Sequence, residues 1–527
     1  MAKFNKVGTK ASVSSPVRTE RVPSGRTHEG APGYARDAKS ELFLLAVSNM
    51  VGEDTFYERA HHRDARFRDL VHQVAVEDVE WLAGFLPWLR TEANMRSAPI
   101  VAALEAVAAR LALGLHGGNR RLVASVLQRA DEPGEALAYW TANHGRAVPK
   151  PVKRGIADAV RRLYNERSLL KYDGDTRAFR FADVIELTHP APAPDKPWQG
   201  DLFAHALDRR HERDKPIPRS LRVLRERAEL MALPVAERRA ALADVDRLAR
   251  AGITWEALAG WLQGPLDAEA WCAVIPSMGY MALLRNLRNF DQAGVPDEVA
   301  ERVAAKLADP GEVARSRQLP FRFLTAYRNA PSLRWGHALD RALRLATGNI
   351  PAFGGRTLVL VDTSASMSCG AVSARSSVRP VEAAALFGVA LAARGANVDL
   401  YGFADDVFEH GVVRGGSVLK QVDEFCRRIG EVGHGTRIAD ALRRTYRGHD
   451  RVVVFTDMQT MTGHHGLEVT DAVPAHVPLY GFNLVGYKHA MMPTGARNRH
   501  EIGGFSDATF RLIPLLEAGE NARWPWL

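Results

Sequence analysis

The sequence of 527 residues contains only three cysteines, Cys272, Cys369 and Cys426. So few cysteines in a long chain make a disulfide framework implausible and fit a reducing compartment. No pair of them has the CxxC spacing of a structural zinc site. The chain also lacks the apolar run of a signal peptide and the roughly 18 uninterrupted apolar residues of a membrane helix. We therefore expect a cytoplasmic protein that does not associate with membranes.

The short motifs of common hydrolases and nucleotide-binding enzymes are missing as well. The sequence contains no GxSxG, no HExxH and no GxxxxGK[ST]. His434 and the pair His464–His465 are interpreted as loop or surface histidines rather than catalytic bases. We expect a protein that is not an enzyme.

Positive charge is present in excess, and it is unevenly distributed. The net charge is +9, yet the segment from Arg356 to the end carries 18 basic and 18 acidic residues. Residues 1–40 carry 8 basic and 3 acidic residues, which leaves a net +4 for residues 41–355. This asymmetry suggests that the first two thirds meet a polyanion, and local clusters rather than the total charge must carry that hypothesis.

The length predicts at least two domains, and three segments differ in composition. Residues 1–36, rich in Ser, Pro, Gly and basic residues, predict a flexible basic tail that either contacts a partner or is an inert solubilising extension. Over residues 37–350 apolar side chains recur at helical spacing, as in Leu42, Leu45 and Ala46. Many short helices in succession favour an α-helical repeat (HEAT-like) ring or solenoid over a single bundle.

Residues 351–527 alternate between strand and helix patterns. Apolar strands are expected at 356–361, 398–403, 451–456 and within 477–485, with helices at 381–394, about 419–429 and from 438. This order predicts an α/β doubly wound domain with a mainly parallel sheet and helices on both faces.

Polar residues with oxygen side chains follow the expected strands of this domain. They are Asp362, Ser364 and Ser366 after the first strand, Thr436 at the start of a helix, and Asp457 after the strand 451–456. Ligands in such sheets bind at the carboxyl ends of the strands, where these loops can converge. An oxygen-only set suits a small hard cation such as Mg²⁺. The alternative is a group of helix N-caps without an ion, since Ser, Thr and Asp also cap helices.

These five residues, in this order, resemble the DxSxS…Thr…Asp pattern of the von Willebrand factor A domain and its metal-ion-dependent adhesion site. The resemblance implies that Ser364, Ser366 and Thr436 bind the metal directly. Asp362 and Asp457 would bind it directly or through water. An open coordination position would accept an acidic group from a partner.

Together with the helical part, this domain resembles the TROVE family, which includes the Ro autoantigen and its bacterial relatives. The segments that carry the resemblance are 43–57, 278–289, 320–327 and 503–507. It implies a ring of helical repeats closed by the A domain. The ring would bind Y-type small noncoding RNA outside and single-stranded 3′ ends of misfolded RNA in its hole. Bacterial relatives act in RNA quality control and decay, with an exoribonuclease tethered through the RNA.

Candidate RNA-binding residues come from residue patterns and from this resemblance. Basic side chains cluster on an expected helix at Lys150, Lys153, Arg154 and Arg161, where a solvated helix face is the alternative. Lys171, Arg177 and His189 resemble the family's Y-RNA contact region. Arg285 and Arg288 lie at helical spacing on the polar side of a later helix and face single-stranded RNA or neighbouring helices.

The sequence thus favours an RNA-binding scaffold with Mg²⁺ in its A-like domain. The alternative is a metal-dependent protein–protein interaction adaptor that binds no RNA. A third hypothesis, a metal-dependent nuclease, predicts RNA cleavage that Asp362→Ala abolishes, and we expect no such cleavage.

Overall fold

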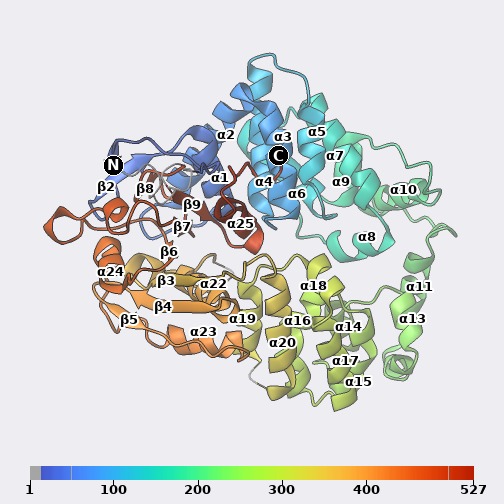
Figure 1. Ribbon diagram of the computed structural model, residues 1–527. Helices are drawn as coiled ribbons and strands as arrows, with labels where there is room; N and C mark the ends of the chain where they lie inside the picture. The colour runs from blue at the N-terminus through green and yellow to red at the C-terminus, as the bar shows by residue number, and fades with distance from the viewer. Residues whose placement is uncertain (1–12, 49, 331, 375, 496–497) are drawn as a thin grey trace, which may run out of the picture.

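The computed structural model describes residues 13–48, 50–330, 332–374, 376–495 and 498–527. Its elements follow a closed circuit, in which two arcs of helices are joined at one side by a short connecting segment and at the other by an α/β domain (Figure 1). The helical ring and the doubly wound α/β domain predicted from the sequence are confirmed.

The first arc consists of ten helices within the described residues. They are α1 (Ala38–Ser48), α2 (Ala60–Glu77), α3 (Val79–Thr91), α4 (Ser97–Ala112), α5 (Asn119–Val126), α6 (Glu132–His144), α7 (Lys150–Leu163), α8 (Glu166–Tyr172), α9 (Phe181–Thr188) and α10 (Gln199–Arg210). Helix α4 is the centre of this arc, since its apolar residues are buried almost all round and it packs against α2, α3, α5 and α6. Helix α7 instead buries one stripe and leaves a basic face toward solvent.

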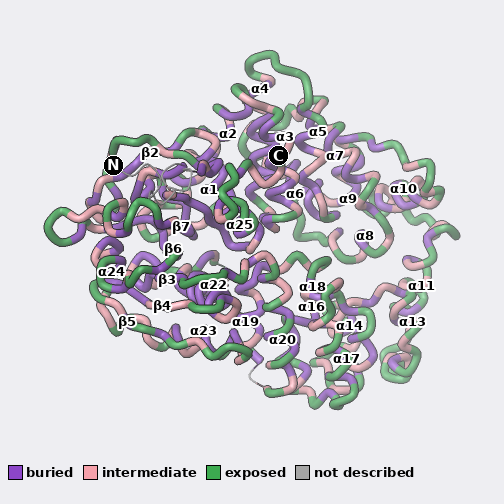
Figure 2. Tube along the Cα trace, viewed as in Figure 1, coloured by how far each residue is buried: buried purple, intermediate pink, exposed green. Residues whose placement is uncertain are grey.

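The second arc continues with shorter helices. They are α11 (Arg222–Met231), α12 (Val235–Arg238), α13 (Val245–Arg250), α14 (Trp255–Leu262), α15 (Ala268–Val274), α16 (Tyr280–Gln292), α17 (Asp297–Leu307), α18 (Pro310–Ser316), α19 (Phe321–Asn329) and α20 (Leu333–Ala346). Buried residues recur along both arcs, interrupted by exposed stretches of the chain (Figure 2). Most of these helices, though not the short α12, therefore bury apolar residues against their neighbours, as in helical-repeat proteins.

The α/β domain has a six-stranded sheet in the order β5-β4-β3-β6-β7-β9, parallel except for the edge strand β5. Its elements are β3 (Arg356–Asp362), α21 (Ala365–Ser368), α22 (Pro380–Arg394), β4 (Asn397–Phe403), β5 (Val407–Glu409), α23 (Val418–Cys426), α24 (Ile438–Thr445), β6 (Arg451–Thr456), β7 (Leu479–Asn483), β9 (Arg499–Gly503) and α25 (Leu512–Glu517). Strand β9 and the short β5 were not expected from the sequence.

Alternation along the central strand explains the helices on both faces of the sheet. Val359 and Val361 of β3 join one apolar cluster with α22 and α23, while Leu358 and Leu360 join another with α24. Successive side chains of a strand point to opposite faces, so a strand buried on both faces is apolar throughout. This burial fixes the carboxyl ends of β3 and β6 side by side.

Both ends of the helical part contact the α/β domain. Helices α19 and α20 pack on α22 and α23, and α1 packs on β9. The chain then returns to the first arc, where the Trp526 ring lies 4.9 Å from Phe85 and 5.1 Å from Trp81 between centroids. A methyl group at Gly84 would lie 2.4 Å from the Trp526 ring, so this aromatic contact requires glycine there. The C-terminal residues therefore join the α/β domain to the first arc.

The prediction of a mobile tail over residues 1–36 is wrong for residues 13–36, while residues 1–12 lie outside the described part. Strands β1 (Gly25–Arg26) and β2 (Pro32–Ala35) form a hairpin, and β2 pairs with β8 (His489–Ala490). Composition shows only that these side chains make a poor core. Instead, strand pairing supplies hydrogen-bond partners for the backbone N–H and C=O groups of this segment. Composition does not reveal this contribution to its order.

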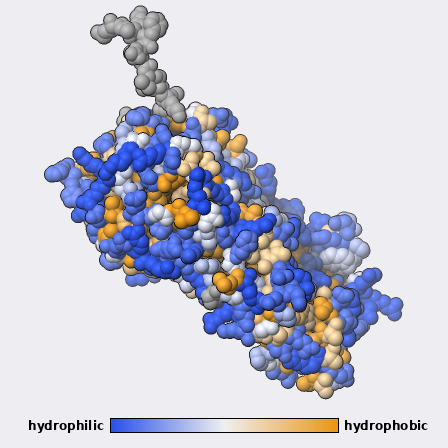
Figure 3. Space-filling model, turned by 60° about the horizontal axis from the view of Figure 1, so that its bottom comes forward, coloured by the Kyte–Doolittle hydropathy of each residue, from blue (hydrophilic) through white to orange (hydrophobic). Residues whose placement is uncertain are grey.

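The surface is polar in general. Figure 3 shows a mostly hydrophilic face on which apolar residues occur in small scattered groups. Within the residues that the structure describes, no helix combines the length and the apolar character needed to cross a membrane.

Candidate functional site

The oxygen-bearing loops after β3 and β6 meet at one edge of the sheet. The two strands are parallel neighbours with Val361 opposite Phe455, so both end at the same edge. The Thr456 hydroxyl donates to Oδ2 of Asp362 at 2.6 Å. The last residues of both strands are thus in direct contact, as their spacing in the sequence predicts.

The loop that carries Thr436 is tied to the other two by backbone hydrogen bonds. The Ala365 N–H donates to the His434 carbonyl at 2.9 Å, and the Met461 N–H donates to the Thr436 carbonyl at 2.8 Å. Three loops far apart in the sequence therefore converge. The side chains of the five predicted ligands, Asp362, Ser364, Ser366, Thr436 and Asp457, are all nearly or completely buried.

A further acidic residue, Asp405, holds the Thr436 loop in place. Its Oδ2 accepts hydrogen bonds from the N–H groups of His434 at 3.0 Å and Gly435 at 3.1 Å. A side chain at Gly435 would lie 2.2 Å from the Asp405 carboxylate, so the loop needs glycine at this contact. Asp405 follows β4, the strand beside β3, and its position after an apolar strand was the signal that could have pointed to it.

Neither carboxylate of the site forms an ion pair with a basic side chain among the described residues. Burial raises the pKa of Asp362, and burial together with repulsion from Asp362 raises the pKa of Asp457. Asp362 accepts from the Ser364 N–H at 2.9 Å, and Asp457 accepts from the Gln459 N–H at 2.9 Å. The second oxygen of Asp457 is buried without a hydrogen-bond partner among the described residues.

This donor set fits a small hard cation. The hydroxyl oxygens of Ser364 and Ser366 lie 3.2 Å apart, and Oδ2 of Asp457 has no hydrogen-bond partner within the part of the chain that the structure describes. Divalent magnesium prefers such oxygen ligands and retains several waters. Among the described residues no group of three or more His, Cys, Asp and Glu side chains has metal-binding spacing, so hydroxyls would share the coordination with the two carboxylates.

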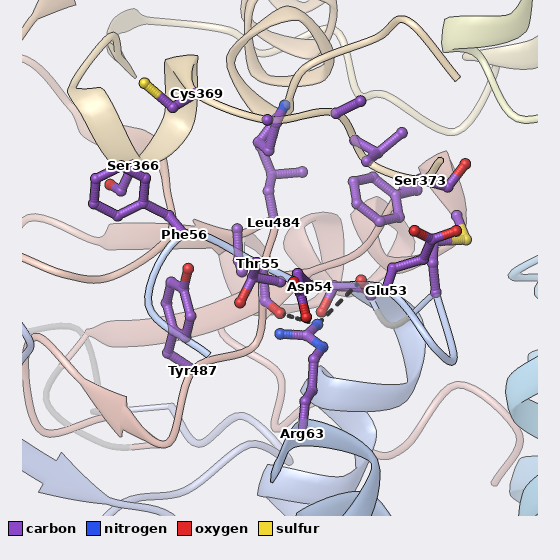
Figure 4. A pocket seen from close by; sticks show the side chains of 18 of the residues that line it. Glu53, Asp54, Thr55, Phe56, Arg63, Ser366, Cys369, Ser373, Leu484 and Tyr487 are labelled. Atoms are coloured by element: carbon purple, nitrogen blue, oxygen red, sulfur yellow. Dashed lines mark hydrogen bonds between the residues drawn. The ribbon is translucent and has the colours of Figure 1, made fainter. Parts of the chain in front are cut away.

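A cavity of about 360 Å³ opens beside these loops. Its lining combines Ser366 and Cys369 with residues 53–56 of the helical part and with Tyr487 (Figure 4). Arg63 of α2 donates a hydrogen bond to the backbone carbonyl of Val485. The candidate metal centre therefore lies where the first arc meets the α/β domain.

The predicted basic face of α7 is exposed and joins a second helix. Lys150 and Arg154 are exposed, and with Arg120 and Arg121 of α5 they line a shallow groove. Arg120 binds Asp158 through two contacts of 2.6 Å, which neutralises the acidic residue of the groove. Sequence reasoning missed the α5 arginines, although two consecutive arginines at a helix start were a visible signal.

The other two basic residues of this helix differ from Lys150 and Arg154. Lys153 and Arg161 are only partly exposed. Neither lines the groove between α5 and α7. The predicted cluster is therefore not one uniform surface.

The residues matched to the Y-RNA contact region lie around α9. Lys171, Arg177 and His189 are all exposed. Asp173 accepts from the Phe181 N–H at 2.7 Å, which places Lys171 near the start of α9, whereas His189 follows its end. Lys171 and His189 therefore lie near opposite ends of α9, which spans roughly 12 Å.

Arg285 and Arg288 form a separate basic pocket. Both are exposed on α16 and line a pocket with Arg322 of α19. Burial lowers the pKa of Arg322, and the charge of Arg285 lowers it further. Asn286, by contrast, is buried and donates to the Ala282 carbonyl at 2.8 Å, so it supports the helix.

Comparisons with known proteins agree with this architecture. Residues 248–349, which include α16, α19 and α20, match the model of the TROVE domain. Within these residues the chain is similar to the TROVE domain. The "RNA-binding protein RO60" of Deinococcus radiodurans is 25% identical over 404 residues, which cover 70% of this chain and 71% of that protein.

A solved structure extends the similarity to nearly the whole chain. The crystal structure of the Deinococcus radiodurans RO (RSR) protein matches with a TM-score of 0.59 and 20% identity, over 91% of this chain and 100% of that chain. This likeness establishes the fold alone. The region similar to the TROVE domain, residues 248–349, therefore lies within the second arc and contains α14 to α20.

Proposed function

We propose that this protein is an RNA-binding scaffold, without catalytic activity, that binds Y-like small noncoding RNA and single-stranded RNA ends. The TROVE domain and the similarity to a protein named for RNA binding support this proposal. The observation that carries it is the exposed groove of Lys150, Arg154 and Arg121, in which the one acidic side chain is already paired with Arg120. Such a surface attracts phosphates irrespective of sequence.

The two basic regions would bind different kinds of RNA. Structured RNA would lie over the exposed surface of the first arc, from the α5–α7 groove to Lys171 and His189. The pocket of Arg285, Arg288 and Arg322 is smaller and carries amides beside its guanidinium groups, which suits an unpaired strand. We place the protein in RNA quality control or decay, with an exoribonuclease tethered through the bound RNA.

The cation proposed for the α/β domain is Mg²⁺. Ser364, Ser366 and Thr436 would hold it with Asp362 and Asp457. Its chemistry there would be electrostatic, since it would offset two buried carboxylates where the first arc meets the sheet. The three cysteines are free thiols, in keeping with a reducing compartment, which we propose is the cytoplasm.

Binding to a structured RNA measured over a range of salt concentrations tests the scaffold. We expect affinity to fall steeply with salt, with a slope of about −0.9 per phosphate neutralised. Sequencing of RNA that co-purifies with the protein identifies the class that is bound. Salt-insensitive or undetectable binding would instead favour the protein–protein adaptor. RNA cleavage in Mg²⁺ that Asp362→Ala abolishes would favour the nuclease.

A further inference from the structure

The N-terminal hairpin presents an acidic residue at its tip. Strands β1 and β2 are joined by a turn in which the Thr27 N–H donates to the Ala31 carbonyl at 2.9 Å and the Gly30 N–H to the Thr27 carbonyl at 3.0 Å. Gly30 has a φ of +91°, a left-handed conformation that favours glycine. Glu29 precedes this glycine and is therefore the side chain that the turn projects.

The turn is fastened to the loop that carries Asp457. The Thr27 hydroxyl donates to the Thr460 carbonyl at 2.7 Å, and the His28 N–H donates to Oε1 of Gln459 at 2.8 Å. The backbone N–H of Gln459 in turn donates a hydrogen bond to Asp457. Thr27 is only 4% exposed, so this contact is part of the packed structure. The tip of the hairpin is thus tied directly to the candidate metal centre.

Tyr57 connects the Glu29 carboxylate to the same centre from the helical side. Its hydroxyl donates to Oε1 of Glu29. The Tyr57 ring stacks on His28 at 4.6 Å between centroids with 5° between planes. The backbone N–H of Tyr57 donates a hydrogen bond to the Tyr487 hydroxyl at 3.2 Å. Tyr57 therefore links the Glu29 carboxylate to Tyr487, which lines the same cavity as the predicted ligand Ser366.

A third carboxylate at this place needs an explanation. Asp362 and Asp457 are both buried and form no ion pair among the described residues, and the hairpin brings the Glu29 carboxylate to the loop that carries Asp457. Bringing a further negative charge to such a pair is unfavourable unless a cation is present. Direct ligation is not indicated, because no three carboxylates among the described residues have metal-binding spacing.

We infer that Glu29 is an outer-sphere ligand of the cation, which accepts hydrogen bonds from water on its open side. This inference rests on the cation site proposed above. Mg²⁺ keeps several of its waters in protein sites, and carboxylates that bind such waters tune its affinity.

The arrangement couples three segments through one ion. The hairpin supplies Glu29, the loop before α2 supplies Tyr57, and the sheet supplies the five ligands. Cation binding thereby fastens the N-terminal hairpin and the first arc to the α/β domain.

The test compares Glu29→Gln with Glu20→Gln in the full chain. Glu20 is exposed on the same segment, so its replacement removes the same charge away from the site. The probes are Mn²⁺, followed by its EPR signal, and Mg²⁺, followed by calorimetry. We expect Glu29→Gln to weaken cation binding about 10- to 100-fold. Glu20→Gln should bind as the wild type does.

Hydrogen exchange provides the second readout. Mg²⁺ should slow exchange in residues 25–35 of the wild type and of Glu20→Gln, but not of Glu29→Gln. If the wild type binds neither ion, the cation site and this inference both fall. If the wild type binds and Glu29→Gln binds equally well, only the role of Glu29 is overturned. If Glu29→Gln does not fold, Glu29→Asp replaces it, and unchanged Mn²⁺ affinity of that variant overturns the inference.

Discussion

Arg36 and Glu501 form an ion pair of 2.6 Å across 465 residues of sequence, with side chains that are 1% and 0% exposed. Arg36 also donates to the carbonyls of Tyr487 at 2.7 Å and Lys488 at 2.8 Å. Glu501 belongs to β9 and accepts a further hydrogen bond from Asn483. The pair therefore anchors the N-terminal segment to the far edge of the sheet.

Removal of one partner of this pair should destabilise the protein strongly. Arg36→Met or Glu501→Leu leaves an opposite charge buried and uncompensated, which costs about 3–5 kcal/mol. The double variant should be more stable than either single variant, because it leaves neither charge behind. Chemical unfolding of the four proteins measures this. Additive losses in the double variant would show that the two residues do not act as a pair.

Asp457→Asn should change stability in opposite directions with and without Mg²⁺. Without the ion, the change removes repulsion between two buried carboxylates and should raise the melting temperature by a few degrees. With Mg²⁺, the wild type should gain stability through ligand binding and the variant should not. Thermal unfolding with added EDTA or Mg²⁺ measures both effects. A variant that gains as much from Mg²⁺ as the wild type does would contradict the assignment of Asp457.

Much of the α/β domain could be predicted from the sequence, because its central strands are buried on both faces. An apolar run such as Val452–Phe455 marks a strand whatever its neighbours are, and the polar residues after it must lie at the sheet edge. Strand β9, with the sequence RHEIG, has no such pattern. Arg499 and Glu501 are buried through partners far away in the sequence, which local patterns do not reveal.

The position of Glu29 beside the candidate metal centre could not be predicted either, because it too depends on partners far away in the sequence. The hairpin is held by backbone bonds to β8 and by contacts to Gln459 and Thr460. Its own composition is that of a disordered tail. Likewise, Arg121 was missed because the groove arises only when α5 packs against α7. Helical periodicity predicts the faces of single helices, not which helices share a surface.

Lys150→Ala with Arg154→Ala should weaken binding of structured RNA by at least tenfold at low salt. Two fewer phosphate contacts should also reduce the salt slope by about 2, because each neutralised phosphate contributes about 0.9. The control is Lys420→Ala with Arg443→Ala, which removes two exposed charges from the α/β domain. Filter binding over a salt series distinguishes the pairs. Equal losses in both would mean that only net charge matters.

Arg285→Ala with Arg288→Ala should affect unpaired RNA selectively. We expect about tenfold weaker binding of a short single strand and little change for a structured RNA, because the α16–α19 pocket is small. Lys171→Ala with His189→Ala should show the reverse pattern. Fluorescence anisotropy with both RNAs completes the comparison. If each pair weakened both RNAs equally, the two regions would form one continuous site.

His500 gives the protein a predictable sensitivity to acid. Its side chain lies on β9, 0% exposed, stacked on Tyr480 at 5.4 Å between centroids, and neither ring nitrogen has a hydrogen-bond partner among the described residues. Burial, with a smaller contribution from Arg499, lowers the pKa of His500 from 6.5 to about 4. The folded protein therefore keeps this ring neutral where the unfolded chain already binds a proton.

The pKa of His500 is lower in the folded state than in the unfolded state. The stability that the neutral ring contributes is therefore complete above pH 6.5 and is lost as the pH falls toward 4. The loss attributable to His500 should reach about 3 kcal/mol at most. His500→Phe keeps an aromatic ring against Tyr480 without a titratable group, so its unfolding free energy should fall less over this range. His476→Phe, at an exposed position, serves as the control. Urea unfolding at several pH values measures the difference, and identical pH profiles for His500→Phe and the wild type would mean that another group causes the acid sensitivity.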